Sequence, residues 1–135
     1  VENQIVGDCS KDMIFGFSTG ALIAYQIAAQ IKFRLALICS ISSILGKDLL
    51  LYPQQEVEKI FSTSQIKELS EMSYQQSISP IALFYGTLET FEVINRTKKL
   101  HTSFGGDLIS VIKTKHKLSK NYQEAIKKYL ASKEL

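Results

Sequence analysis

The sequence has few of the residues on which several classes of protein depend. Its 135 residues include no tryptophan and only two each of cysteine, proline, methionine and histidine. The two cysteines, Cys9 and Cys39, make neither a disulfide framework nor a metal-ligand cluster, so we interpret both as reduced structural thiols. No apolar run reaches the ~20 residues of a membrane-spanning helix, and the mostly polar residues 1–11 do not resemble a signal peptide. These absences predict a cytoplasmic protein with no metal site and no action at a membrane.

Charged residues are moderate in number and are not concentrated in one place. The 16 lysines and arginines exceed the 13 aspartates and glutamates by a net charge of +3, and only Arg34 and Arg96 are arginines. Nucleic-acid binding usually needs a basic face with aromatic or motif support, and neither is evident. With 45% hydrophobic and 21% charged residues, the composition is that of one globular domain with a solvated, lysine-rich surface and no nucleic-acid partner.

Apolar runs alternate with helical patterns along most of the chain. Short continuous apolar runs indicate buried strands, and strands separated by helices favour a parallel sheet that is covered on both faces. The predicted fold class is therefore α/β, a mostly parallel sheet of about four strands flanked by helices. Strands are expected at 12–17, 35–41, 81–85 and 108–112, and helices at about 19–33, at 91–101 and from 119 onward.

The segment 42–79 interrupts this alternation. It contains two short amphipathic patterns, at about 55–61 and 64–72, in which apolar residues fall at helical spacing. We expect a small helical insert between the second and third strands of a single domain that covers residues 1–135.

The most informative segment is Gly16-Phe17-Ser18-Thr19-Gly20, a G-x-S-x-G motif between an expected strand and an expected helix. A nucleophilic serine on a sharp strand-to-helix turn takes strained backbone angles, and glycines two residues to either side remove side chains that would collide. The start of the helix directs its amides at a developing oxyanion, and the Thr19 amide would be one donor. The alternative interpretation is a glycine-rich turn that binds phosphate, although it lacks the lysine and the longer glycine spacing of a P-loop.

A serine nucleophile needs a histidine to take its proton and an acid to orient that histidine. His116 follows the fourth expected strand, so it is predicted at the carboxyl edge of the sheet, where Ser18 also lies. Functional groups of open α/β sheets gather at this edge. His101 falls late in an expected helix beside Lys98 and Lys99, and we expect it on the solvated surface.

Three carboxylates are candidates for the acid. Glu89 follows the third expected strand at the same edge and stands between Ser18 and His116 in the sequence. Glu92 is a neighbour that could replace it, and Asp48, after the second strand, is a rival. We predict Glu89.

The order of serine, acid and histidine, each after a successive strand, resembles the α/β-hydrolase family. The resemblance extends from Asp12 to the last helix and corresponds to the fifth to eighth strands of that family. It implies Ser18 as nucleophile, Glu89 as acid and His116 as base of an esterase or thioesterase that needs neither a cofactor nor a metal ion. Segment 42–79 is similar to the helical cap of such enzymes. Candidate walls of a substrate pocket, or else residues that pack the insert onto the sheet, are Leu45, Leu49, Tyr52, Phe61 and Met72.

The sequence departs from that family in one respect. The first four strands of the family, and the loop that supplies a second oxyanion donor, have no counterpart. One such donor contributes roughly 3 kcal/mol, about a hundredfold or more in rate. The strand that carries Ser18 would also be an open apolar edge, prone to pair with another chain. Because the first residue is Val1 and not Met, we expect a part of a longer protein, with self-association through this edge as the alternative.

The predicted function is acyl transfer to water, in which a serine hydrolase cleaves a small-molecule ester or thioester through an acyl-enzyme. Lys113, Lys115 and Lys117 would suit an anionic substrate such as a phosphopantetheine thioester, or else form a solvated loop. The alternative function is a non-catalytic, hydrolase-like module that binds a small ligand or a protein partner. A Ser18→Ala variant separates these two functions, because a binder keeps its affinity and a hydrolase loses turnover.

Overall fold

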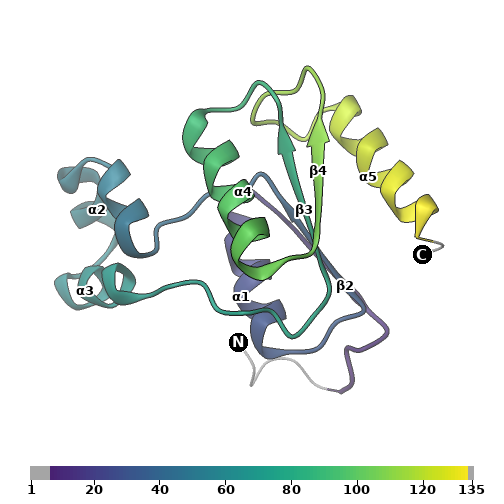
Figure 1. Cartoon of the computed structure of the whole chain (residues 1–135). Coiled ribbons are helices and arrows are strands. Elements are labelled where there is room, and N and C mark those ends of the chain that lie inside the picture. Colours follow the sequence, from purple (N-terminus) through teal and green to yellow (C-terminus); the bar gives the residue numbers. More distant parts are fainter. Residues whose placement is uncertain (1–6, 134–135) are drawn as a thin grey trace. The chain divides into compact units, whose positions relative to one another are not determined.

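The structure, a computed structural model, describes residues 7–133 of the chain. It contains two compact units. The sheet unit consists of the described residues up to Ser42 and from Gln76 onward, and the insert unit is Ser43–Gln75. In chain order (Figure 1) the elements are β1 Met13–Phe17, α1 Thr19–Gln30, β2 Leu35–Cys39, η2 Gly46–Leu51, α2 Gln54–Ile60, α3 Thr63–Glu71, β3 Ile81–Gly86, α4 Phe91–Phe104, β4 Asp107–Val111 and α5 Lys120–Ser132.

The sheet unit is built on a four-stranded sheet in the order β1-β2-β3-β4, in which all neighbouring strands are parallel. The register pairs Phe17 with Cys39, Cys39 with Phe84, and Gly86 with Val111. The carboxyl ends of the four strands therefore meet at one edge of the sheet. The predicted α/β class, with about four parallel strands flanked by helices, is confirmed.

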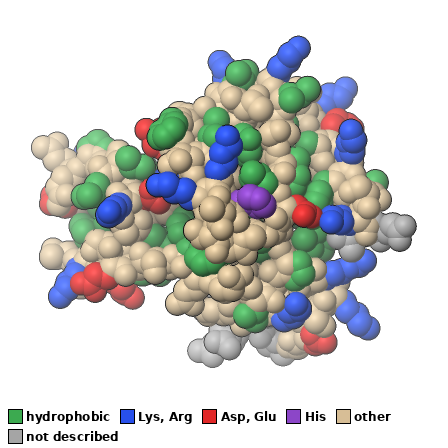
Figure 2. Space-filling model, in the orientation of Figure 1, with side chains coloured by type: hydrophobic (Ala, Val, Ile, Leu, Met, Phe, Trp, Pro, Cys, Tyr) green, Lys and Arg blue, Asp and Glu red, His purple; other side chains and the backbone are tan. Residues whose placement is uncertain are grey.

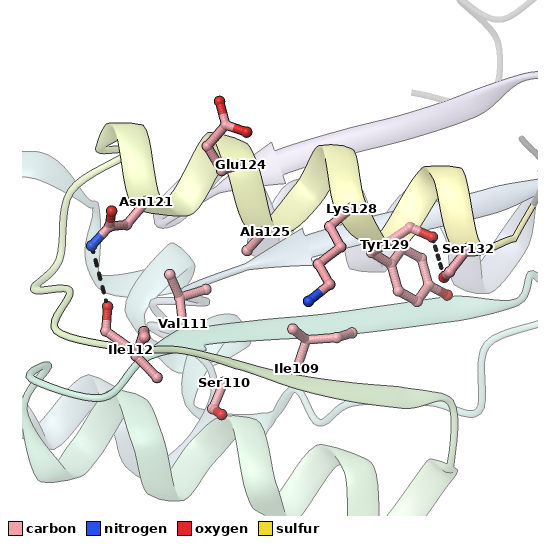
Figure 3. A pocket seen from close by; sticks show the side chains of 10 residues that line it. All are labelled: Ile109, Ser110, Val111, Ile112, Asn121, Glu124, Ala125, Lys128, Tyr129 and Ser132. Atoms are coloured by element: carbon pink, nitrogen blue, oxygen red, sulfur yellow. Dashed lines mark hydrogen bonds between the residues drawn. The ribbon is translucent and has the colours of Figure 1, made fainter.

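Helices cover both faces of this sheet. Helix α1 packs on β1 and β2, and α4 packs on β3 and β4. Figure 3 shows α5, in yellow, on one side of β4 and the green helix α4 on the other side. Since both faces are covered, every residue of β2 is buried, as expected for a central parallel strand. The apolar cluster on the α5 side consists of Leu35, Leu37, Cys39, Ala82, Phe84, Val111 and Tyr122.

The end of α5 is tied to the start of β4. The Tyr129 hydroxyl donates a hydrogen bond of 2.7 Å to Oδ2 of Asp107, and Lys133 Nζ lies 3.1 Å from the same oxygen. The hydrogen bond from Tyr129 is the main reason why the pKa of the Asp107 carboxyl lies below its ordinary value, and the contact with Lys133 lowers this pKa further. Burial and the contact with Asp107 raise the pKa of the Tyr129 phenol, so it stays a donor.

The strands and helices expected from the sequence are present, with shifted boundaries. Strand β2 ends at Cys39 and not at 41, because Ser40 takes a left-handed backbone angle, φ 48°. Helix α4 continues past His101 to Phe104 and ends at Gly105, which has φ 81°. Glycine adopts this conformation without steric cost, so it stops the helix.

The insert unit is helical and thinly packed. Ser62 caps α3 by accepting from the amide of Gln65, whose side chain accepts in return from the amide of Ser62. Helix α3 buries no residue, and Ile60 at the end of α2 is 72% exposed. A cavity of about 470 Å³ within the unit is lined by Gly46, Lys47, Leu49, Leu50, Tyr52, Gln54, Val57, Ile66 and Ser70. The role of this unit as a substrate cap stays a prediction.

The surface has two features that bear on partners. Strand β1 is an edge strand of the described sheet, and its Met13 and Phe15 are 44% and 47% exposed. Figure 2 shows one face of the molecule, on which lysine and arginine side chains lie apart from one another. Among residues 7–133, no helix combines the length and the apolar character needed to cross a membrane.

Candidate active site

The motif serine occupies a strained turn between β1 and α1. Ser18 has φ 60° and ψ −121°, and its amide donates to the carbonyl of Cys39 at 3.0 Å. A Cβ atom added at Gly16 would lie 2.1 Å from the carbonyl oxygen of Gly20, so only glycine fits there. A Cβ atom at Gly20 would meet no described atom within 4 Å. The expected steric reason for a glycine is therefore found at Gly16, and at Gly20 the described residues provide no such reason.

His116 contacts both of the other predicted residues. Its Nε2 lies 2.8 Å from Oγ of Ser18, and its Nδ1 lies 2.5 Å from Oε1 of Glu89. The ring of Phe17 packs beside the imidazole, with 5.1 Å between the ring centroids. The side chain of His116 is 38% exposed and that of Glu89 is 0% exposed. The three side chains thus form a continuous chain of contacts that runs from the surface into a buried carboxylate.

The loops that carry the acid and the histidine are tied to each other. The amide of Leu88 donates to the carbonyl of Thr114 at 2.9 Å, and the amide of Lys113 donates to Oγ1 of Thr87 at 3.0 Å. A Cβ atom at Gly86 would lie 2.2 Å from the carbonyl oxygen of Thr114. Glycine at this position therefore permits the close approach that brings the two loops together.

Both oxygens of the acid are occupied. While Oε1 of Glu89 contacts His116, its Oε2 accepts from the amide of Gly86 at 2.6 Å and from the hydroxyl of Ser40 at 2.5 Å. The hydroxyl of Tyr122 lies 2.8 Å from Oγ of Ser40. Burial of a carboxylate is costly unless its oxygens accept hydrogen bonds, and both oxygens of Glu89 have partners.

The positions of the hydrogen atoms in this network follow from which groups can donate and which can only accept. A carboxylate only accepts, so Nδ1 of His116 carries a proton, and in the neutral ring Nε2 is then an acceptor. Ser18 donates its proton to Nε2. The hydroxyl of Ser42, 3.1 Å from Oγ of Ser18, therefore donates to that oxygen. The serine is held between a proton acceptor and a donor, which is the orientation that a nucleophile needs.

Sequence reasoning missed Ser40, Ser42 and the hydroxyl of Tyr122 as members of this site. Ser40 and Ser42 follow a buried strand at the carboxyl edge of the sheet, and that position was a usable signal. Tyr122 was assigned only to the apolar face of the last helix. Its hydroxyl meets Ser40 across 82 positions of sequence, and no local pattern reveals such a contact.

The rival residues are in other places. Glu92 is exposed in the first turn of α4, and Asp48 is in η2 of the insert unit. His101 lies near the end of α4, which runs from the end of β3 back to the start of β4, so it is at the opposite edge of the sheet. Its Nδ1 is buried and has no hydrogen-bond partner among the described residues. The expectation that His101 is simply solvated is therefore wrong for this atom.

The predicted oxyanion donor, the amide of Thr19, lies at the start of α1. Thr19 is the first residue of α1, and amides in the first turn of a helix have no partner in their own helix. These amides also lie at the positive end of the helix dipole. The loop beyond this site carries the exposed side chains of Lys113, Lys115 and Lys117.

A second cavity, of about 530 Å³, is separate from these residues (Figure 3). It follows the outer side of β4, where Ile109 and Val111 point toward α5 and Lys128 extends over the opening. None of the three predicted triad residues lines it. Among the side chains of residues 7–133, no group of three or more His, Cys, Asp or Glu residues could hold a metal ion.

Comparisons with known proteins give one kind of match. No protein-family model and no curated protein matches the sequence. Among solved structures, MGS-MChE2, an α/β-hydrolase enzyme from the metagenome of sediments of the Mar Chica lagoon, Morocco, is 13% identical with a TM-score of 0.66. The enol-lactonase from Burkholderia xenovorans LB400 is 13% identical with a TM-score of 0.59, and esterase PE8 is 14% identical with a TM-score of 0.54.

The matches cover nearly all of this chain but a smaller share of each solved structure. They cover 94%, 92% and 94% of this chain, and 64%, 65% and 52% of the respective structures. The chain therefore spans between about half and two thirds of the length of its structural neighbours. Identities this low show the fold alone. From the strand that precedes Ser18 to the last helix, the chain has the α/β-hydrolase fold.

Proposed function

We propose that this chain is the catalytic part of a serine hydrolase that cleaves carboxylic esters or thioesters. The observation that carries the proposal is the pair of contacts made by one imidazole, 2.8 Å to the Ser18 hydroxyl and 2.5 Å to the Glu89 carboxylate. An imidazole between a hydroxyl and a buried carboxylate is the arrangement that activates a serine. The strained angle of Ser18 supports the same role, because strain of this kind concentrates at functional sites.

In the proposed reaction, Nε2 of His116 takes the proton of Ser18 as Oγ attacks the acyl carbon. The amide of Thr19 donates to the oxyanion, and Glu89 stabilises the imidazolium. The intermediate collapses, and the departing alcohol or thiol takes the proton from His116. Water then attacks the acyl-enzyme with His116 again as base, and the proton returns to Ser18 as the acid is released.

A second oxyanion donor belongs to this proposal. In the complete fold it comes from a loop that precedes the nucleophile strand. We propose that further strands beside the exposed edge of β1 bring this donor. A single donor is worth about 10²–10³ in turnover, so this chain by itself should acylate slowly. The alternative occupant of that edge is a second copy of the chain, and a sedimentation experiment on the chain distinguishes the two.

The test is labelling with a fluorophosphonate and mapping of the adduct by mass spectrometry. The expected adduct is on Ser18, and it disappears in Ser18→Ala. The two histidines supply a matched pair: His116→Gln should slow labelling at least about a hundredfold, and His101→Gln should leave it unchanged. Equal rates in these two variants, or no adduct on a sample that unfolds cooperatively, would contradict the proposal.

A non-catalytic binding module is the second candidate. One observation favours it: the matches cover only 52% to 65% of the structural neighbours, and in the complete fold a second oxyanion donor comes from a loop before the nucleophile strand. If the module only binds, Ser18→Ala keeps its affinity for an ester probe and the wild type shows no acyl-enzyme. A phosphonate adduct on Ser18 would exclude this candidate.

A further inference from the structure

A buried pair of hydroxyls lies behind the acid. Ser40 and Tyr122 are both 0% exposed, and they come from the end of β2 and the first turn of α5. Their contacts, 2.5 Å from Ser40 to Oε2 of Glu89 and 2.8 Å from Tyr122 to Ser40, continue the line of side chains that begins at Ser18. The hydrolase mechanism proposed above assigns no role to either of them.

The direction of the hydrogen bonds follows from the number of protons. Ser40 has one hydroxyl proton and gives it to the carboxylate, which can only accept. The phenol of Tyr122 must therefore donate to Oγ of Ser40. Burial raises the pKa of this phenol above its ordinary value, so the phenol keeps its proton. The chain is directional from Tyr122 through Ser40 to Glu89.

The backbone of Ser40 indicates that this arrangement has a cost. Its φ of 48° lies in the left-handed region, where a non-glycine residue is strained. Glycine would relieve the strain and lose the hydroxyl. The backbone conformation at this position favours glycine. Serine is present instead, and its hydroxyl makes a charge-assisted hydrogen bond to Glu89.

We propose that Ser40 and Tyr122 are positioning residues that fix the rotamer of Glu89. The hydroxyl of Ser40 and the amide of Gly86 together hold Oε2, so that Oε1 faces Nδ1 of His116. Tyr122 in turn orients the hydroxyl of Ser40. This inference rests on the proposed hydrolase function, because it assigns a role to the acid of that site.

The kinetic test is a double-mutant cycle in the full 135-residue chain, with the rate of fluorophosphonate labelling of Ser18 as the readout. A hydrogen bond to a charged group predicts a loss of about 10- to 100-fold for Ser40→Ala, and Tyr122→Phe should lose about 3- to 10-fold. In the Ser40→Ala background, Tyr122→Phe should cause no further loss, since its acceptor is gone. If the fold-losses of the two single variants multiply in the double variant, Tyr122 does not act through Ser40 and the proposal is overturned.

Ser40→Gly separates the hydroxyl from the backbone. It should unfold at a higher denaturant concentration than Ser40→Ala, because it relieves the strain at φ 48°, and still label as slowly. A labelling rate that followed stability, with Ser40→Gly near the wild type, would overturn the positioning role.

A second readout does not need reactivity. In ¹⁵N-histidine NMR spectra, the Nδ1 proton of His116 reports the hydrogen bond to Glu89, and His101 is an internal control. We expect this proton signal to shift in Ser40→Ala, to shift less in Tyr122→Phe, and the His101 signals to stay in place. An unchanged His116 signal in Ser40→Ala would refute the inference. Failure of the wild type to label, with these shifts present, would instead contradict the proposed function and leave the positioning role supported.

Discussion

The two motif glycines should respond in opposite directions to the same substitution. In Gly16→Ala, the new Cβ would lie 2.1 Å from the carbonyl oxygen of Gly20 and 2.7 Å from Cα of Ala21. These are backbone atoms, so the turn must open by about 1 Å to reach an ordinary contact distance. Overpacking of this kind costs about 1–3 kcal/mol in unfolding free energy. A displacement of about 1 Å at a reacting group can slow chemistry about a hundredfold.

In Gly20→Ala, the new methyl group meets no described atom within 4 Å, and the residue lies in the first turn of α1. Alanine is the better helix former, so this variant should gain up to about 1 kcal/mol. The two variants should therefore differ by about 1–4 kcal/mol in urea unfolding, with labelling of Ser18 slowed only in Gly16→Ala. Equal destabilisation of the two variants would refute the steric reasoning, and so would a normal labelling rate in a folded Gly16→Ala protein.

Three further predictions follow from other parts of the chain. Glu89→Gln should slow fluorophosphonate labelling by about 10³–10⁴, as loss of the orienting charge does in other triads, while Glu92→Gln should stay within about twofold; the reverse order would assign the acid to Glu92. The contacts with α5 lower the pKa of Asp107, so Asp107→Asn should lose stability at pH 7, by less than about 1 kcal/mol because the group is exposed. That difference should shrink as the pH falls through the lowered pKa of the wild-type carboxylate and vanish once this carboxylate is also protonated; a difference that persists in urea titrations at the most acidic pH would contradict the cause. Burial raises the pKa of the Cys39 thiol, so a thiol reagent should modify only Cys9 in the native chain and reach Cys39 on unfolding; rapid native modification of Cys39 would contradict its burial.

The parts of the fold that local pattern determines were predictable. Continuous apolar runs such as residues 35–39 become central strands because both faces of a parallel sheet are covered. The G-x-S-x-G motif predicted the turn at Ser18, and Ser119 predicted the start of α5, where its side chain accepts from the amide of Tyr122. Strand ends were less predictable, because β2 stops where Ser40 leaves the extended region.

The residues that contact the three predicted site residues were harder to predict than those three residues themselves. The rule that functional groups collect at the carboxyl ends of parallel strands selected Ser18, Glu89 and His116. It could not show which serines after β2 belong to the site, because the role of Ser40 depends on its contact with Glu89 and that of Ser42 on its contact with Ser18. Tyr122 reads as an apolar residue in sequence, and only the packing of α5 brings its hydroxyl to Ser40.

Activation of the serine and stabilisation of the oxyanion are separable in this chain. Every side chain from Tyr122 through Glu89 to Ser18 belongs to the sheet unit. Hydrogen bonds between the loops after β3 and β4 hold the acid and the base together without residues from the insert unit. In our proposal, the first turn of α1 donates one hydrogen bond to the oxyanion, and further strands bring the second donor. Labelling of this chain therefore tests activation of Ser18 together with the one donor that we assign to these residues, whereas turnover of an ester at full rate also requires the second donor.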